Sequence, residues 1–346
     1  MTARVPVLGI TMGDPAGVGP EITVKALARP DVVSACRPIV VGDAGILGAT
    51  IEVLRSPLRV HAVSAVGECA FAPGTLECLD LANVDVAALP RARVSAEAGR
   101  AAYAYIERAV RLCQSGEIEG MVTAPVNKEA LAAAGVRHSG HTEILAELSG
   151  TKDFAMLLMG KELRVIHVTT HVALRRVPDL VTRERVGRVI ELAQATMTFL
   201  GVARPRIAVC GLNPHAGEDG LFGDEEKTAI APAIDAARHA GLDVFGPLPA
   251  DTLFSRARGG EFDIVVAMYH DQGHVPVKTL GFTYDESAGT WTGLSGVNVT
   301  VGLPFLRVSV DHGTAFDRAW KGIANPESMV EALDVAVRML REHRPA

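Results

Sequence analysis

The sequence predicts an α/β protein with buried parallel strands and more than one domain. Its 346 residues are about twice the length of a typical domain. Short apolar runs bounded by polar residues are typical of buried strands in parallel sheets. Hydrophobic residues make up 48% of the chain, and its 34 glycines suit helices packed closely on a sheet.

The most informative stretch is DIVVAMYHDQGHVPVK, at residues 263–278. It begins with an apolar strand candidate at 264–268, and His270, Asp271 and Lys278 follow. In open α/β sheets, ligands bind beyond the carboxyl ends of the strands. A possible metal ligand, a carboxylate and a cation are therefore expected where the chemistry would take place.

Two further strand candidates show the same pattern. Residues 163–168 are followed by His171, and residues 206–210 are followed by His215. If these strands share one sheet with 264–268, then His171, His215 and His270 converge on one point, which predicts a three-histidine metal site. No HExxH or CxxC motif supports the site, so structural histidines remain an equal alternative. His167 is expected to be a core residue.

Composition excludes several classes of function. The net charge of −6 gives no basic field for nucleic acid. The five cysteines are scattered, which indicates buried thiols in a reducing cytoplasm. No apolar run approaches the roughly 18 residues of a transmembrane helix, and the N-terminal apolar stretch is too short for a signal peptide. We therefore expect a cytoplasmic protein with neither a membrane nor a nucleic-acid partner.

The first half of the chain begins with a strand at 5–11, the turn GDPAGVGPE and a helix. The turn is not GxGxxG, so it is either a cofactor-facing loop or an ordinary tight turn. Further predictions are a strand at 39–41, a helix at 96–114 capped by Ser95, and a strand at 120–123. His141 and Thr142 open another helix, where N–H groups could bind an anion. The alternative is that Ser139 or Thr142 only caps that helix.

The second half contains predicted helices at 183–200 and 224–240, and the second begins with the acidic residues 224–226. Asp251 precedes a helical turn, residues 282–296 form a hairpin-like loop, and Asn298 lies in a strand at 296–300. Residues 303–311 alternate, and Arg307 on that strand is costly unless it pairs with an anion. A last helix begins at residues 325–327 and runs to about 342.

Several long motifs in one order resemble the PdxA family, the 4-hydroxythreonine-4-phosphate dehydrogenases and their relatives. They are ITMGDPAGVGPEI, TAPVNKEAL, GHTEILAE, NPHAGEDGLFGDEE, GPLPADTLF, YHDQGHVPVK and GVNVTVGLPFLRVSVDHGTAFD. The resemblance implies two α/β/α domains, 1–130 plus 300–346 and 131–299. It also implies a cleft like that of isocitrate and isopropylmalate dehydrogenases, and a homodimer with sites at its interface.

The resemblance also implies functional residues. They are the divalent-metal (Zn, Mg, Mn or Co) ligands His171, His215 and His270; the substrate-binding residues His141, Thr142, Lys278, Asn298 and Arg307; and Gly13, Asp14, Asp311, His312 and Gly313 in the loops on the NAD or NADP side. The metal would bind the substrate's 3-hydroxyl and carboxylate, C3 would lose hydride to the nicotinamide, and the 3-oxo acid would lose CO2. Lys278, Asp251 and Asp271 are the candidate catalytic residues for proton transfer or support.

The branch of the family is the remaining question. The lengthened link at 282–296 and His274 after DQG resemble relatives that oxidise 4-phospho-D-threonate or 4-phospho-D-erythronate to dihydroxyacetone phosphate, in carbohydrate metabolism. The alternative is the 4-phosphohydroxy-L-threonine dehydrogenase of pyridoxine biosynthesis. A third branch acts on aromatic cis-dihydrodiols, and the complete set of phosphate-site residues argues against it. A metal hydrolase or a non-catalytic binding protein are the alternatives from other classes.

Overall fold

The computed structural model describes residues 5–138, 140–160, 162–281, 283–286, 290–292 and 296–342. The chain forms two compact units, one of residues 1–152 and 303–341 and the other of residues 153–302 and 342–346. This division differs from the boundary expected at residue 130, because residues 131–152 cluster with the first unit. Both units combine strands and helices, as the predicted α/β class requires.

The first unit has a parallel sheet with the strand order β3-β4-β2-β1-β5-β14 within the described residues. Most consecutive residues of its inner strands are buried, so both faces of the sheet are covered. The strands are β1 (Val7–Thr11), β2 (Arg37–Gly42), β3 (Arg59–Val63), β4 (Thr75–Asp80), β5 (Gly120–Thr123) and β14 (Leu306–Val310).

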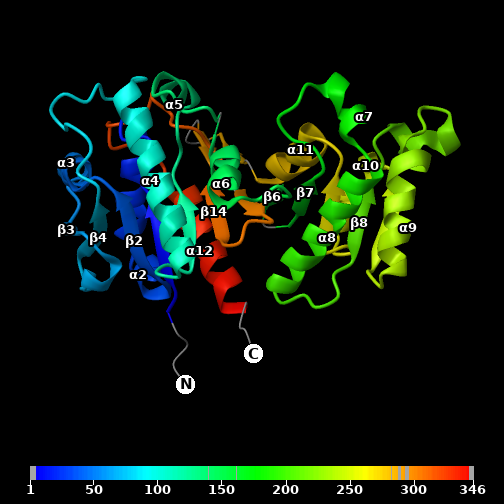
Figure 1. Cartoon of the computed structure of the whole chain (residues 1–346), viewed down its shortest axis with the longest axis horizontal. Coiled ribbons are helices and arrows are strands. Elements are labelled where there is room, and N and C mark those ends of the chain that lie inside the picture. Colours follow the sequence, from blue (N-terminus) through cyan, green and yellow to red (C-terminus); the bar gives the residue numbers. More distant parts are fainter. Residues whose placement is uncertain are drawn as a thin grey trace. The chain divides into compact units, whose positions relative to one another are not determined.

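The helices of this unit pack on the sheet and on one another. Helix α4 packs on β1, β2 and β5, and α5 and α6 pack on α4 (Figure 1). As predicted, the Ser95 hydroxyl caps α4 by accepting from the Ala98 N–H at 3.1 Å. The helices are α1 (Gly19–Leu27), α2 (Pro30–Ala35), α3 (Ala44–Leu54), α4 (Ala96–Ser115), α5 (Lys128–Ala133), α6 (His141–Ser149) and α12 (Glu327–Glu342).

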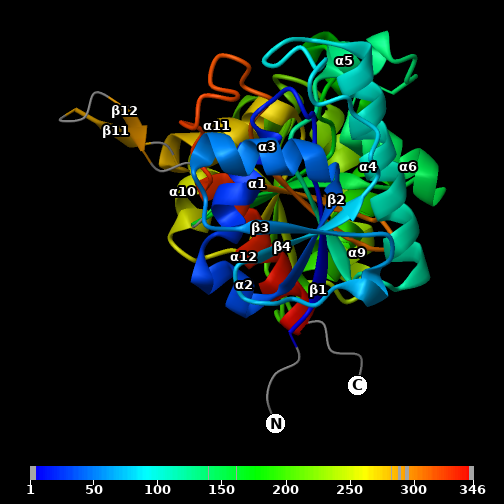
Figure 2. The same ribbon diagram turned by 90° about the vertical axis from the view of Figure 1, so that its left-hand side faces the viewer.

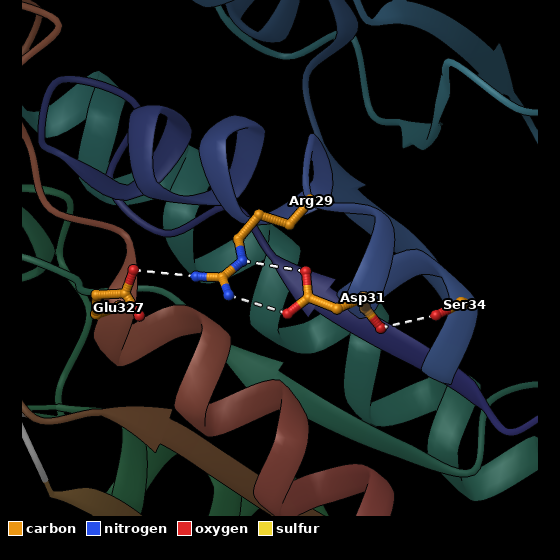
Figure 3. Close-up of polar contacts among 4 residues, drawn as sticks. All are labelled: Arg29, Asp31, Ser34 and Glu327. Atoms are coloured by element: carbon orange, nitrogen blue, oxygen red, sulfur yellow. Dashed lines mark hydrogen bonds and ion pairs between the residues drawn. The ribbon is translucent and has the colours of Figure 1, made fainter.

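A polar cluster joins the start of the chain to its last helix. Arg29 donates to Asp31 at the start of α2 and to Glu327 at the start of α12, while the Ser34 hydroxyl donates to the Asp31 carbonyl (Figure 3). The Arg29 side chain is 39% exposed, so solvent screening keeps the contribution of each pair to stability small. The cluster therefore links residues 29–34 to the start of α12 and adds little to the stability of the unit.

The second unit has a mixed sheet with the strand order β13-β6-β7-β10-β8-β9 within the described residues. β6 pairs antiparallel with β13 and with β7, and the pairs from β7 to β9 are parallel. The strands are β6 (Ala155–Met159), β7 (Arg164–His167), β8 (Ile207–Cys210), β9 (Val244–Leu248), β10 (Ile264–Ala267) and β13 (Val297–Val301).

Helices and one two-stranded ribbon complete this unit. The ribbon pairs β11 (Thr283–Asp285) with β12 (Thr290–Thr292) and extends beyond α11, in agreement with the predicted hairpin (Figure 2). None of the described helices is both long and apolar enough to cross a membrane. The helices are α7 (Val177–Leu180), α8 (Arg183–Phe199), α9 (Ala231–His239), α10 (Ala250–Arg258) and α11 (His270–Gly281).

The patterns did not predict α3, α11, β6 or β9. Helix α11 contains Gly273 and Pro276, two residues that disfavour a helix interior, but packing against β7 and β6 holds it. The predicted helix at 224–240 is divided into a π-helical turn at Glu226–Ile230 and α9. The sequence predicts that polar and apolar residues of the strand at 303–311 lie on opposite faces. In β14 both kinds are buried, because residues 307–310 are all buried.

Candidate active site

Side chains hold the ends of three strands of the second unit together. The Thr169 hydroxyl, just after β7, donates to the Met268 carbonyl after β10 at 2.8 Å. The Gln272 side chain accepts from the Met268 N–H at 2.7 Å and donates to the Gly211 carbonyl after β8 at 2.8 Å. The loops that carry the three predicted metal ligands therefore begin from ends that are fixed to one another.

Two of those ligands lie close together. The ring centroids of His171 and His270 are 5.6 Å apart. His270 Nδ1 lies 2.6 Å from a carboxylate oxygen of Asp271, and its ring stacks on His274 at 3.7 Å between centroids, with 8° between the ring planes. His270 is thus held on one side by a carboxylate and on one face by a second imidazole.

His167 continues this row of imidazoles into the core, as expected for a core histidine. It is fully buried, its Nδ1 lies 3.1 Å from the Met156 carbonyl, and its ring centroid is 4.7 Å from that of His274. Burial lowers its pKa to about 3, so the ring is neutral. A Cβ added at Gly273 would lie 2.3 Å from His167 Nε2, so only glycine fits there.

The third predicted ligand, His215, lies in a turn of unusual backbone conformation. Five consecutive residues from His215 to Asp219 have positive φ, from 43° to 83°, and four of them are not glycine. His215 Nδ1 lies 3.1 Å from a carboxylate oxygen of Glu218, and its side chain is 64% exposed. Non-glycine residues in this region are strained and are found often at functional sites.

A metal ion requires its donor atoms to lie close together around one point. Among the described residues, no group of three or more His, Cys, Asp or Glu is placed to hold one. The structure brings His171 and His270 together, and the three-histidine site remains a prediction. The donor chemistry fits, however. His215 and His270 each have Nδ1 beside a carboxylate, the arrangement that orients metal-ligating histidines and presents Nε2 as the donor.

The other predicted residues of this unit lie on α10, α11 and β13. Lys278 is half-buried, two turns along α11 from His270. Asp251 is exposed in the first turn of α10, and Asp271 is 78% exposed at the start of α11. Asn298 lies in β13, in register with Leu158 of β6.

In the first unit, Arg307 of β14 is a buried cation. It is 5% exposed, and its Nε and Nη2 donate to the Thr123 hydroxyl at the end of β5, at 3.1 and 2.8 Å. Burial lowers its pKa to about 9, and the nearby Glu143 opposes that shift. The guanidinium is therefore charged at neutral pH.

His141 and Thr142 belong to this unit and open α6, as predicted. The pKa of His141 lies well below its usual value because of burial, with a smaller effect from the positive charge of Arg307. Its Nε2 is buried and has no hydrogen-bond partner among the described residues. The helix N-cap is Gly140, and no side chain caps it. Ser139, the alternative cap, lies outside the described residues.

The two loops expected on the cofactor side contact each other. The Val18 N–H donates to the Thr314 carbonyl at 3.0 Å, and Trp320 Nε1 donates to the Pro15 carbonyl at 3.1 Å. Asp14 is fully buried, and burial raises its pKa to about 6. A Cβ on Gly13 would lie 2.4 Å from the Pro125 carbonyl, so this residue packs as in an ordinary tight turn. The three other predicted residues are Asp311, His312 and Gly313, which follow β14.

Sequence reasoning missed Thr123, Thr169 and Gln272, which hold the predicted site residues in place. Their only signal is position, because each follows or ends a predicted buried strand on the expected ligand side. A hydroxyl or amide side chain at the end of a strand is equally typical of an ordinary polar loop residue. Its hydrogen-bond partner is distant in sequence, so the sequence does not reveal the contact.

Comparison with known proteins identifies the family. The model of the pyridoxal phosphate biosynthetic protein PdxA matches residues 34–336. The D-threonate 4-phosphate dehydrogenase of Cupriavidus necator is 52% identical over 334 residues, 96% of this chain and 97% of that protein. Its counterpart in Pectobacterium atrosepticum is 46% identical, over 96% and 99%. The crystal structure of a 4-hydroxythreonine-4-phosphate dehydrogenase from Burkholderia phymatum is 50% identical, with a TM-score of 0.84 over 97% and 98%. The chain therefore belongs to the PdxA family.

Proposed function

We propose that this protein is an NAD- or NADP-dependent, divalent-metal-dependent dehydrogenase of D-threonate 4-phosphate or its erythronate epimer. The substrate loses two electrons from C3 to the nicotinamide, and the resulting 3-oxo acid releases CO2 to give dihydroxyacetone phosphate. The observation that carries the proposal is the 52% identity, over nearly the full length of both chains, to a dehydrogenase named for this substrate.

A phosphorylated acid requires cationic and hydrogen-bonding groups that water does not screen. Arg307 meets this need, because it is buried, charged at neutral pH and held by Thr123. His141 is neutral, so its buried Nε2 can exchange a hydrogen bond with a substrate oxygen without adding a second charge. We assign these two residues and Thr142 to the substrate's anionic groups, with Asn298 and Lys278 as further contacts.

His171, His215 and His270 would hold the divalent ion, which is Zn²⁺, Mg²⁺, Mn²⁺ or Co²⁺. A bound ion of this kind lowers the pKa of a substrate hydroxyl and stabilises negative charge as CO2 leaves. Asp271 and Glu218 orient two of the imidazoles through Nδ1. Lys278, Asp251 and Asp271 are proposed to move protons at the substrate hydroxyl and at the carbon that loses CO2.

The oxidant is NAD or NADP, and we assign its binding to the two contacting loops of the first unit. Gly13 and Asp14 are buried, so they would shape the turn, whereas Gly313 is exposed and can approach a ligand closely. Asp311 and His312 directly precede Gly313 on that second loop.

We propose that the protein is a homodimer. Several large apolar side chains are exposed on the segments that follow β7 and β8 and on α11: Leu174 (68%), Leu221 (72%), Phe222 (50%) and Val275 (60%). Exposed apolar side chains on the segments that carry functional residues support the proposal of a protein interface there. The test is the mass from sedimentation, which we expect to be twice that of the chain and to fall by half in Leu221→Asp. The five cysteines are free, which supports a reducing cytoplasmic location.

The experiment that tests the proposed reaction follows NADH absorbance with NAD, a divalent metal and one phosphorylated acid at a time. We expect turnover with D-threonate 4-phosphate, weaker turnover with D-erythronate 4-phosphate, and none with unphosphorylated D-threonate. Preferred turnover of 4-phosphohydroxy-L-threonine would place the enzyme in pyridoxine biosynthesis, the alternative that the Burkholderia phymatum structure favours by its name. Hydrolysis without nicotinamide would identify a metal hydrolase instead.

A further inference from the structure

Glu226 is a buried carboxylate that no predicted role explains. Its side chain is 4% exposed, and the sequence pattern places it only among the acidic residues in the first turn of a helix. One carboxylate oxygen accepts from the N–H groups of Leu212 and Asn213, both at 2.7 Å. The other accepts from Asn213 Nδ2 at 2.9 Å. Three donors from the segment after β8 thus converge on one side chain.

The backbone around Glu226 is shaped for this contact. Glu226 begins the π-helical turn Glu226–Ile230, a rare conformation that is found frequently at functional sites. A Cβ added at Gly217 would lie 2.8 Å from one carboxylate oxygen, and one added at Gly211 would lie 3.1 Å from the other. The carboxylate therefore lies inside the 211–217 loop, which closes around it because two of its residues have no side chain.

This loop carries His215 in its left-handed turn. The backbone bonds of Glu226 end at Asn213, two residues before His215, and the close approach of Gly217 lies two residues after it. The carboxylate thus fixes the chain on both sides of the histidine. Other described contacts of the turn are local, for example those from the Ala216 N–H to the Asn213 carbonyl at 3.1 Å and from the Phe222 N–H to the Gly217 carbonyl at 3.2 Å.

We propose that Glu226 is a positioning residue that aims His215 at a divalent metal ion. The inference rests on the metal site of the proposed function. In this role Glu226 does not touch the ion. Its carboxylate orders the loop, the loop orients the imidazole of His215, and the imidazole binds the metal. Partners of this kind typically change metal affinity by about 10- to 100-fold when they are removed.

The test measures cobalt binding to the full-length, metal-free protein by its visible absorption. Glu226→Met keeps the length of the side chain and removes both acceptor oxygens, so we expect Co²⁺ to bind about 10- to 100-fold more weakly. Glu226→Gln keeps one oxygen and should lose less, which also covers the case in which the Met variant fails to fold. The matched control is Glu225→Met, since the bond that the described residues give Glu225 is one accepted from Asn213 Nδ2, at 2.7 Å; we expect a change of about threefold or less.

Two further readouts separate positioning from general destabilisation. The cobalt spectrum of Glu226→Met should shift in the same direction as that of His215→Ala. Amide hydrogen exchange in the metal-free protein should increase in residues 211–220 and stay unchanged in β7 and β10. Unchanged cobalt affinity, an equal loss in Glu225→Met, or exchange that rises throughout the second unit would each overturn the inference. A wild-type protein that takes up no cobalt would overturn the metal of the proposed function as well.

Discussion

The two sets of proposed site residues are built in opposite ways. In the first unit, Arg307 is 5% exposed and bonded to Thr123, so the cation is desolvated and oriented before any ligand arrives. In the second unit, His215 and His270 have 64% and 36% of their side chains exposed and follow the ends of strands. Thr169, Gln272 and the buried Glu226 fix the strand ends and the loop beneath them, and the two imidazoles extend from that support toward solvent.

The two sets therefore differ in when their binding groups lose hydration and become ordered, which is before ligand binding in the first unit and on ligand binding in the second. A buried guanidinium has already lost its hydration, so an anion that binds it gains a strong interaction with little reorganisation. Exposed imidazoles keep their hydration until an ion binds, and their order depends on the loops. The first set should therefore respond to changes of charge and packing, and the second to loss of a donor atom.

The largest expected effect is on the second set. His270→Ala removes one predicted ligand, and turnover should fall by about 10³-fold or more, because metal polarisation is worth several kcal/mol. The free energy of unfolding should change by no more than about 1 kcal/mol, since the side chain is 36% exposed. The measurements are kcat and urea unfolding. His239→Ala, at an exposed histidine on α9, is the control and should keep full activity. Full turnover in His270→Ala would contradict the assignment of His270 as a ligand of a catalytic metal.

The next effect concerns Arg307. Arg307→Met should lower kcat/KM by about 10²-fold or more, because the anion loses a buried, hydrogen-bonded cation. Stability should change by no more than about 1 kcal/mol, since relief of the desolvation penalty offsets the lost bonds to Thr123. The control is Arg29→Met, at a half-exposed arginine of the same unit. Severe unfolding with unchanged kinetics would make Arg307 a structural residue.

A third prediction concerns Asp14, whose pKa burial raises to about 6 from 3.8. The folded state holds this proton more tightly than the unfolded state, so the stabilising contribution is present below pH 4 and is lost as pH rises through 6. Asp14→Asn should remove that loss and stabilise the protein by roughly 2 to 3 kcal/mol at pH 7. Urea unfolding of both proteins from pH 4 to 8 checks this. The prediction would be contradicted if the difference in free energy of unfolding between Asp14→Asn and the wild type did not increase between pH 4 and 6.

The smallest effect is that of Thr123. Thr123→Val leaves two buried donors of Arg307 without their acceptor, which costs about 1 to 2 kcal/mol and should raise KM roughly tenfold. Thr123→Ser keeps the hydroxyl and should keep KM close to that of the wild type. Steady-state kinetics decide the outcome, and a serine variant as weak as valine would point to packing instead of hydrogen bonding.

The regular elements were predictable where local pattern and burial agree. The run Gly120–Thr123 is buried on both faces and forms β5, and Ser95 caps α4 as expected. Helix α11 was not predictable, because Gly273 and Pro276 oppose a helix locally and only tertiary packing overrides them.

The site followed the same rule. Which strands carry His171 and His270 could be predicted from apolar runs, and the structure places these rings near each other. The roles of Glu226 and Gln272 could not be predicted, because each bonds a residue that is distant in sequence: Asn213 lies 13 residues from Glu226, and Gly211 lies 61 residues from Gln272. The backbone conformations that admit these bonds leave no local pattern. Long-range hydrogen bonds of this kind are set by the folded chain alone.

The contact between Gly273 and His167 constrains how this protein can change. With His167 Nε2 2.3 Å from where a Cβ would be, any larger residue at 273 must displace the imidazole or lift α11 from β7. Val165 Cγ1 would lie 2.7 Å from the same Cβ, so a larger residue at 273 requires smaller side chains at both 165 and 167 first. An engineer who redesigns α11 to accept a new substrate must begin in the core, four residues upstream of His171.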